Sequence, residues 1–271
     1  MTAETARERQ YLLATPTHFT VAYAINPWMD ATEPVDTARA IEQWQGLVTA
    51  LTDRGHRVHV LDPEPGLPDM VYAANGAFSV GGVVFGAKFR YPQRAAEAAA
   101  HEKWYRERGW RFVAPAEVNE GEGDFAYVPG PGLALAGYGF RTEPRAHAEA
   151  AEALKRPVIS LKLVDERFYH LDTALTVLDD DTIAYYPQAF SAASQEILRR
   201  LFPTAVIADE ADALAFGLNL VSDDKHVFIN AEATGMADKL AARGYEPVVV
   251  DLSELKKGGG SVKCCIAELR D

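Results

Sequence analysis

A pattern of two β-prone runs, a helix and a further β-prone run recurs five times, and it constrains the fold more than any single motif. The strands that follow the five predicted helices begin near residues 58, 112, 158, 206 and 248, at intervals of 54, 46, 48 and 42 residues. Periods of about this size are typical of repeated supersecondary units. Five ββαβ units predict a closed radial α/β fold, with helices outside and strand-end loops around a central cavity. The alternative is an ordinary two-layer α+β domain.

Local patterns place the elements of these units. Alternating residues predict strands at 18–24 and 70–80, and Gly81-Gly82 predicts a hairpin between the second of these and a strand at 83–87. Asp69 precedes the strand at 70–80, and Asn75 lies six residues further, on the same face if the strand is regular. A last strand is predicted at 263–269. Helical spacing of apolar residues predicts helices at 35–54, 94–108, 143–154, 191–201 and 235–243.

Composition narrows the class of protein. The net charge of −12 argues against nucleic acid as a partner, because phosphates bind basic faces. No apolar run approaches the length of a membrane span. Two adjacent cysteines form neither a disulfide framework nor a zinc site, and they fit a reducing compartment. We therefore expect a cytoplasmic protein that binds no metal, no membrane and no nucleic acid.

The two cysteines follow three glycines, Gly258–Gly260, near the end of the chain. Neighbouring side chains in a strand point to opposite faces, so only one of Cys264 and Cys265 can face a given pocket. A thiol held beside a glycine turn is a candidate nucleophile. The alternative is that both cysteines are small buried apolar residues.

Two further clusters are candidates for chemistry. His170 precedes Asp172 at the entrance to a predicted strand, where a loop can present it to a cavity, although a lone loop histidine is more often solvated. Glu120, Glu122 and Asp124 alternate with glycines, and like charges at this spacing repel unless a cation binds there. The alternative for this segment is a solvated acidic loop.

Taken in order, these motifs carry a resemblance to a known family. The segments that carry it are Pro68–Asn75, Glu122–Asp124, Tyr138–Arg141, His170–Asp172 and Gly258–Cys264. They resemble the guanidino-group-modifying (amidinotransferase or pentein) superfamily, which includes dimethylarginine dimethylaminohydrolases, arginine deiminases and amidinotransferases. The resemblance implies a five-bladed ββαβ pseudo-symmetric α/β propeller, with residues 1–271 as a single catalytic domain. The length looks more like the dimethylargininases than the larger deiminases.

The resemblance also implies roles for individual residues. These are Cys264 as nucleophile, His170 as general acid and base, Glu122, Asp124 and Asp69 on the guanidinium, Arg94 and Arg141 on the substrate carboxylate, and Asn26 at the amino-acid end of the substrate or at the cavity rim. The acid of the family motif falls on either Glu120 or Glu122, and we assign it to Glu122. Asn75 stands where family members often have an aspartate that contacts the guanidinium.

The implied activity is hydrolysis of a guanidinium C–N bond without a metal or organic cofactor. Its substrate is Nω-methylated arginine, which gives citrulline plus methylamine or dimethylamine through a covalent S-alkylthiouronium. Asn75 is also similar to arginine dihydrolases, so arginine conversion to ornithine or citrulline is the first alternative. An amidinotransferase and a non-catalytic ribosome-binding propeller are the others, and the presence of Cys264 and His170 argues against the last. The expected partner is a small guanidino amino acid, and a homodimer is compatible with the sequence.

Overall fold

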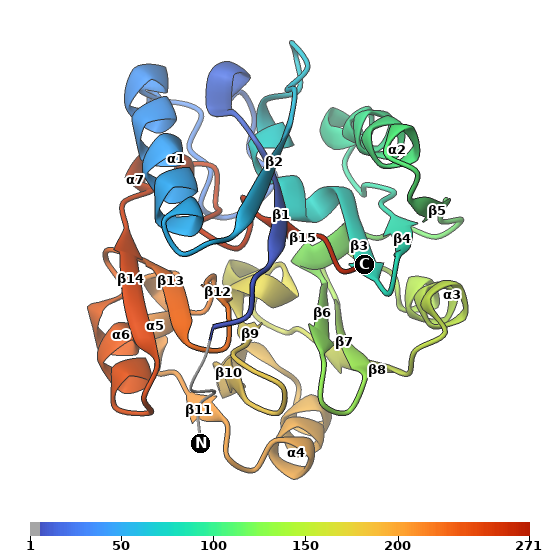
Figure 1. Ribbon diagram of the computed structural model, residues 1–271, viewed down its shortest axis with the longest axis vertical. Helices are drawn as coiled ribbons and strands as arrows, with labels where there is room; N and C mark the ends of the chain where they lie inside the picture. The colour runs from blue at the N-terminus through green and yellow to red at the C-terminus, as the bar shows by residue number, and fades with distance from the viewer. Residues whose placement is uncertain (1–5) are drawn as a thin grey trace.

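Five three-stranded sheets with the same strand pairing build the molecule. The computed structural model describes residues 6–271, so the predicted domain extends five residues beyond it. In each sheet the first two strands are antiparallel and the third is parallel to the second. Figure 1 shows the sheets around one centre, with the long helices on the outside. The predicted closed five-bladed α/β fold is confirmed.

The elements follow the predicted order with shorter strands. The sheets comprise β15 (Ala267–Glu268), β1 (Gln10–Ala14) and β2 (Arg57–Leu61); β3 (Ala77–Val80), β4 (Val83–Gly86) and β5 (Arg111–Val113); β6 (Phe125–Val128), β7 (Leu133–Tyr138) and β8 (Val158–Lys162); β9 (Leu175–Val177), β10 (Ile183–Tyr185) and β11 (Val206–Ile207); and β12 (Val221–Ser222), β13 (His226–Asn230) and β14 (Glu246–Val250). The helices joining second to third strands are α1 (Thr37–Thr52), α2 (Glu97–Glu107), α3 (Pro144–Leu154), α4 (Ala192–Leu201) and α6 (Thr234–Ala241), while α5 (Glu210–Leu214) and α7 (Ser253–Lys256) lie in links.

The two ends of the chain close the ring. The last strand, β15, pairs antiparallel with β1 and completes the first sheet. The predicted strand at 18–24 is wrong, because β1 lies earlier, at Gln10–Ala14. Residues 19–24 still alternate between buried or half-buried and exposed positions, although residues 18–24 pair with no other strand within residues 6–271. The alternation of residue types in this segment therefore reflects alternating burial and not pairing with another strand.

Four short 3-10 turns contain or flank five of the predicted site residues: Asp69, Asn75, Glu122, Asp124 and His170. The strand predicted at 70–80 is instead the two 3-10 turns Pro68–Val71 and Ala73–Gly76 followed by β3. The turns Gly121–Gly123 and Leu171–Thr173 precede the first strands of the next two sheets in the same way. The turn at Ala73–Gly76 packs on that at Gly121–Gly123, which in turn packs on Leu171–Thr173. Loops from three neighbouring sheets therefore converge.

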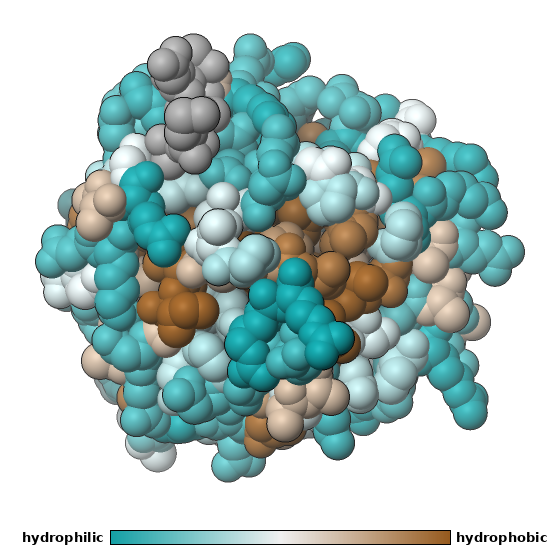
Figure 2. All heavy atoms as spheres, turned by 90° about the horizontal axis from the view of Figure 1, so that it is seen from below, coloured by the Kyte–Doolittle hydropathy of each residue, from teal (hydrophilic) through white to brown (hydrophobic). Residues whose placement is uncertain are grey.

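The outer surface is mainly polar. Figure 2 shows one side of the molecule, where hydrophilic residues surround separate hydrophobic patches. The large apolar side chains that are most exposed are Val60, Val164, Leu201, Ile207 and Val249. Among residues 6–271, no helix has the length and apolar character needed to cross a membrane.

Candidate active site

Cys264 lies in a turn after α7, and only residues 267–268 of the predicted last strand pair as a strand. The argument that the two cysteines face opposite sides of a strand therefore does not apply to them. Both side chains are buried, with exposed fractions of 2% for Cys264 and 0% for Cys265. A Cβ on Gly260 would come within 2.9 Å of the Cys264 Cβ, so a glycine is needed for this close approach.

Two polar groups contact the Cys264 thiol. Its Sγ donates to Asp172 Oδ2 at 3.3 Å and accepts from Asn219 Nδ2 at 3.1 Å. Burial raises the pKa of the Cys264 thiol well above its ordinary value, and the charge of Asp172 raises it further. A cation bound beside the sulfur would oppose both effects and favour the thiolate.

His170 is paired with Glu120. Its Nε2 lies 2.7 Å from Glu120 Oε2, and the same carboxylate oxygen accepts from Arg141 Nη1 at 2.8 Å. Burial opposes ionisation of Glu120, but the Arg141 charge and the His170 hydrogen bond outweigh it and hold the pKa of Glu120 well below its ordinary value. An ionised Glu120 can only accept a hydrogen bond, so His170 Nε2 is the donor in this pair and Glu120 fixes the orientation of the ring.

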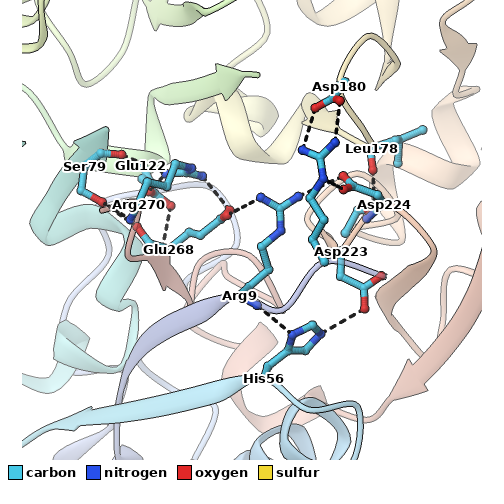
Figure 3. Close-up of polar contacts among 12 residues, drawn as sticks. Arg9, His56, Ser79, Glu122, Leu178, Asp180, Asp223, Asp224, Glu268 and Arg270 are labelled. Carbon is cyan, nitrogen blue, oxygen red and sulfur yellow. Dashed lines mark hydrogen bonds and ion pairs between the residues drawn. The ribbon is translucent and has the colours of Figure 1, made fainter. Parts of the chain in front are cut away.

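The structure places Glu122, to which we assigned the family acid, with partners other than His170. Glu122 is buried in an ion network with Lys263 and Arg270, and it also accepts from the Glu268 backbone N–H at 3.1 Å (Figure 3). Gly121 separates the two acids with a positive φ of +52°, so Glu120 and Glu122 point to different partners. The acid beside His170 is therefore Glu120, which is the other position the motif allowed.

Asp69, Asn75 and Arg94 form a second polar group. Arg94 donates to Asn75 Oδ1 at 2.7 Å and to both oxygens of Glu97 at 2.9 and 2.8 Å. The Asp69 carboxylate accepts from the Tyr23 hydroxyl at 3.0 Å and lies 3.8 Å from the Arg94 guanidinium. Burial raises the pKa of Asp69, with the charge of Arg94 acting against it. These residues lie on 3-10 turns, so the predicted sharing of a strand face is wrong.

Asp124 braces the loop that carries His170. Its two oxygens accept from the Thr142 hydroxyl at 2.7 Å and from the Leu171 backbone N–H at 3.0 Å. Burial raises the pKa of Asp124 to about 6. Both carboxylate oxygens are thus engaged within the protein, which fits a structural brace better than the predicted contact with a guanidinium.

Arg141 and Asn26 lie where the N-terminal loop meets the glycine turn. The Arg141 guanidinium packs on the rings of Tyr91 and Tyr169, 4.7 Å from each centroid, and donates to the Ile25 carbonyl at 2.9 Å. Asn26 Nδ2 donates to the Gly258 carbonyl at 3.1 Å. The loop at 25–26 is therefore attached both to the arginine and to the turn before Cys264.

Among the residues described above, four buried side-chain atoms have no hydrogen-bond partner within residues 6–271. They are Asp69 Oδ1, Asn75 Nδ2, His170 Nδ1 and Asp172 Oδ1. Gly123 lies against two of these side chains, since a Cβ there would lie 2.3 Å from Asn75 Nδ2 and 3.3 Å from Cδ2 and Cγ of the His170 ring. Buried polar groups without partners are costly, so this cluster favours a polar ligand that supplies the missing bonds.

Two residues at the thiol were not among the predicted site residues. In the sequence, Asp172 is recognisable only as part of the motif His170-Leu171-Asp172, and this motif could have identified it as a site residue. Asn219 belongs to none of the recognised motifs, and only the folded structure brings it to Cys264.

Asp172 gives a pH dependence that stability measurements can check. Burial raises its pKa to about 7, from 3.8 for an unperturbed aspartate. Between these values the folded protein keeps a proton that the unfolded chain releases, so this group makes the free energy of unfolding fall as pH rises. Asp172→Asn removes the effect. In urea unfolding, the stability of the variant relative to the parent should increase by about 3 kcal/mol between pH 5 and pH 8. A pH-independent difference would contradict the assignment.

Comparison with known proteins identifies relatives along nearly the whole chain, although no protein-family model matches it. An N(G),N(G)-dimethylarginine dimethylaminohydrolase from Mycobacterium tuberculosis is 55% identical over 265 residues, which cover 98% of this chain and 87% of that protein. The bifunctional arginine dihydrolase/ornithine cyclodeaminase ArgZ from Synechocystis is 34% identical over 264 residues, which cover 96% of this chain and 37% of that protein.

Solved structures agree with these relatives. The N-terminal domain of ArgZ, with a cysteine replaced by serine and a substrate bound, has a TM-score of 0.93 at 32% identity, over 97% of this chain and 99% of that one. A dimethylarginine dimethylaminohydrolase from Pseudomonas aeruginosa, at 19% identity and a TM-score of 0.81 over 96% of this chain and 99% of that one, shares the fold. The superfamily predicted from the motifs is confirmed, and the chain belongs to the guanidino-group-modifying, or pentein, superfamily that includes the dimethylarginine dimethylaminohydrolases and arginine dihydrolases.

Proposed function

We propose that this protein is a cysteine-dependent hydrolase that converts Nω-methylated arginine to citrulline and methylamine or dimethylamine. The observation that carries the proposal is a buried thiol, Cys264, bonded to Asp172, which lies two residues after a histidine paired with a buried carboxylate, His170 with Glu120. The 55% identical relative named as a dimethylarginine dimethylaminohydrolase supports methylarginine as the substrate. The sheets would act as one catalytic domain, and the two free cysteines suit a cytoplasmic location.

The reaction needs two attacks on one carbon. The Cys264 thiolate adds to the guanidinium carbon, and protonated His170 gives its proton to the amine, which leaves as the C–N bond breaks. The product of this half is a covalent S-alkylthiouronium. Neutral His170 then takes a proton from water, and the resulting hydroxide adds to the same carbon. The C–S bond breaks with its electron pair going to sulfur, which restores the thiolate, and the new hydroxyl loses its proton to solvent to give citrulline. Glu120 orients the His170 ring through its hydrogen bond to Nε2, so Nδ1 is the nitrogen that transfers the proton.

The substrate would form hydrogen bonds with the buried polar atoms that have no partner within residues 6–271. Asp69 Oδ1 and Asp172 Oδ1 are acceptors suited to guanidinium N–H groups. We assign the substrate carboxylate to Arg141 and Arg94 and place Asn26 at the rim. Both arginines are already paired with a glutamate, but Arg141 is the stronger assignment because fewer of its N–H groups are engaged. Arg94 donates four hydrogen bonds within the protein, and Arg141 donates two. The partner is a guanidino amino acid, and a homodimer stays a prediction.

Arg141→Lys should raise KM roughly tenfold with a smaller change in kcat, because a point charge replaces a planar fork that also packs between two tyrosine rings. Steady-state kinetics on methylarginine check this. The same assignment predicts slow turnover of agmatine, which lacks the carboxylate. Equal turnover of agmatine and methylarginine would contradict it.

Arginine dihydrolysis to ornithine is the second candidate, and Asn75 favours it. A second hydrolysis acts on a neutral ureido group, which a neutral amide suits better than an unpaired buried carboxylate does. The similarity to ArgZ supports this alternative.

Product analysis separates the candidates. The purified protein is incubated separately with arginine and with asymmetric dimethylarginine, and ornithine, citrulline and dimethylamine are quantified. Citrulline with equimolar dimethylamine is the expected outcome. Ornithine from arginine would reverse the ranking, and no product from either substrate would overturn the hydrolase proposal.

A further inference from the structure

The Asn219 side chain is fully buried between α5 and β12 and contacts the loop of the proposed nucleophile from two sides. We infer that Asn219 is the residue that positions the Cys264 thiol and favours its ionisation. The inference rests on the proposed function only for the role of Cys264. The evidence is the set of hydrogen bonds that the oxygen and the nitrogen of the Asn219 side-chain amide make.

The oxygen side fixes the backbone of the thiol's turn. Asn219 Oδ1 accepts from the backbone N–H of Ser261 at 3.1 Å and from that of Cys264 at 3.2 Å. The backbone carbonyl of Asn219 accepts from the Lys263 N–H at 3.2 Å. Three N–H groups of the segment 261–264 thus end on one residue, which holds the turn in a single conformation.

The nitrogen side fixes the sulfur. Asn219 Nδ2 donates to Cys264 Sγ at 3.1 Å and to the Asp172 backbone carbonyl at 3.1 Å. A flipped amide would place its oxygen against two acceptors and its NH2 group against two backbone N–H groups. The network therefore permits one orientation, in which an N–H points at the sulfur.

This donor counteracts the surroundings of the thiol. The sulfur is buried next to the Asp172 carboxyl, and both features disfavour a thiolate. A hydrogen bond to the charged form favours that form. An amide supplies the bond without a positive charge, so it does not repel a cationic substrate as a lysine would.

Two substitutions test the inference, and a third is a matched control. Asn219→Asp keeps the shape and the acceptor but removes the N–H donors, and Asn219→Ala removes both sides of the amide. Asn230→Asp is the control, because Asn230 is also buried, at 3% exposed, yet its Nδ2 donates to the Ala215 carbonyl.

Ionisation of Cys264 is followed by thiolate absorbance against pH, with Cys264→Ser as the reference. Peptide mass spectrometry then follows alkylation of Cys264 and Cys265 by iodoacetamide.

Both Asn219 variants should shift Cys264 ionisation upward by at least about one pH unit, a tenfold loss of thiolate at a fixed pH below the parent's transition. Alkylation of Cys264 should slow by a similar factor, while Asn230→Asp matches the parent. Cys265 is the internal control, because a variant that only loosens the fold would expose both thiols and speed both reactions. Unchanged Cys264 ionisation in both variants, or faster alkylation of both cysteines, would overturn the inference. None of these readouts requires turnover, so failure of the proposed function would be seen separately, in the product analysis.

Discussion

Replacing Cys264 with serine is expected to lower turnover of methylarginine by roughly 10⁴-fold or more. A serine hydroxyl ionises far less readily than a thiol, so it supplies far less of the attacking anion. Serine is close to cysteine in size, so the buried turn should keep its conformation. Steady-state rates and circular dichroism on the same samples check both points.

Cys265→Ser is the matched control, because it places the same change one residue away. Cys265 is fully buried in an apolar cluster between the first and last sheets, so a hydroxyl there should lower stability while the folded enzyme keeps most of its activity. If the two variants behaved the other way round, the nucleophile would be Cys265.

Substitution of Glu120 and of Glu122 is expected to have different effects, the first on catalysis and the second on stability. Glu120→Gln removes the charge that faces His170 and should lower kcat by ~10²–10⁴-fold, as His170→Ala should. Glu122→Gln should instead lower the free energy of unfolding by about 3–5 kcal/mol, because it leaves Lys263 and Arg270 without their shared carboxylate. Urea unfolding and kcat on both variants give the comparison.

These results would place the family acid at Glu120 and leave Glu122 a structural role. A stable Glu122→Gln variant without activity, together with an active Glu120→Gln variant, would restore the assignment of the acid to Glu122. If both variants lost stability but the folded fraction of each kept a normal kcat, neither glutamate would have a role in catalysis.

The repeated pattern made the fold predictable, and the motifs made its thiol and histidine predictable. Each ββαβ unit has its own apolar strands, so the repeat of the units could be seen in the sequence without knowledge of contacts between distant residues. Cys264 and His170 were identifiable because each stands in a short recognisable segment, Gly258–Cys264 and His170–Asp172.

Features set by distant contacts were not predictable. Residues 18–24 alternate like a strand, but the strand of the first sheet is β1, which pairs with β15 at the other end of the chain. Glu120 and Glu122 differ by two positions, and their partners Arg141 and Arg270 decide which of them meets His170. Asn219 reaches Cys264 across 45 residues of sequence, and it lies in no recognised motif.

Acid-quenched intact-mass analysis tests the central claim, that Cys264 attacks the guanidinium carbon, most directly. Arginine and asymmetric dimethylarginine lose different amines but should leave the same adduct on the protein, equal in mass to citrulline minus water. Peptide mapping should place it on Cys264, and Cys264→Ser should carry none. Turnover with no adduct on Cys264 at any quench time, or an adduct that keeps the methyl groups of dimethylarginine, would contradict the account.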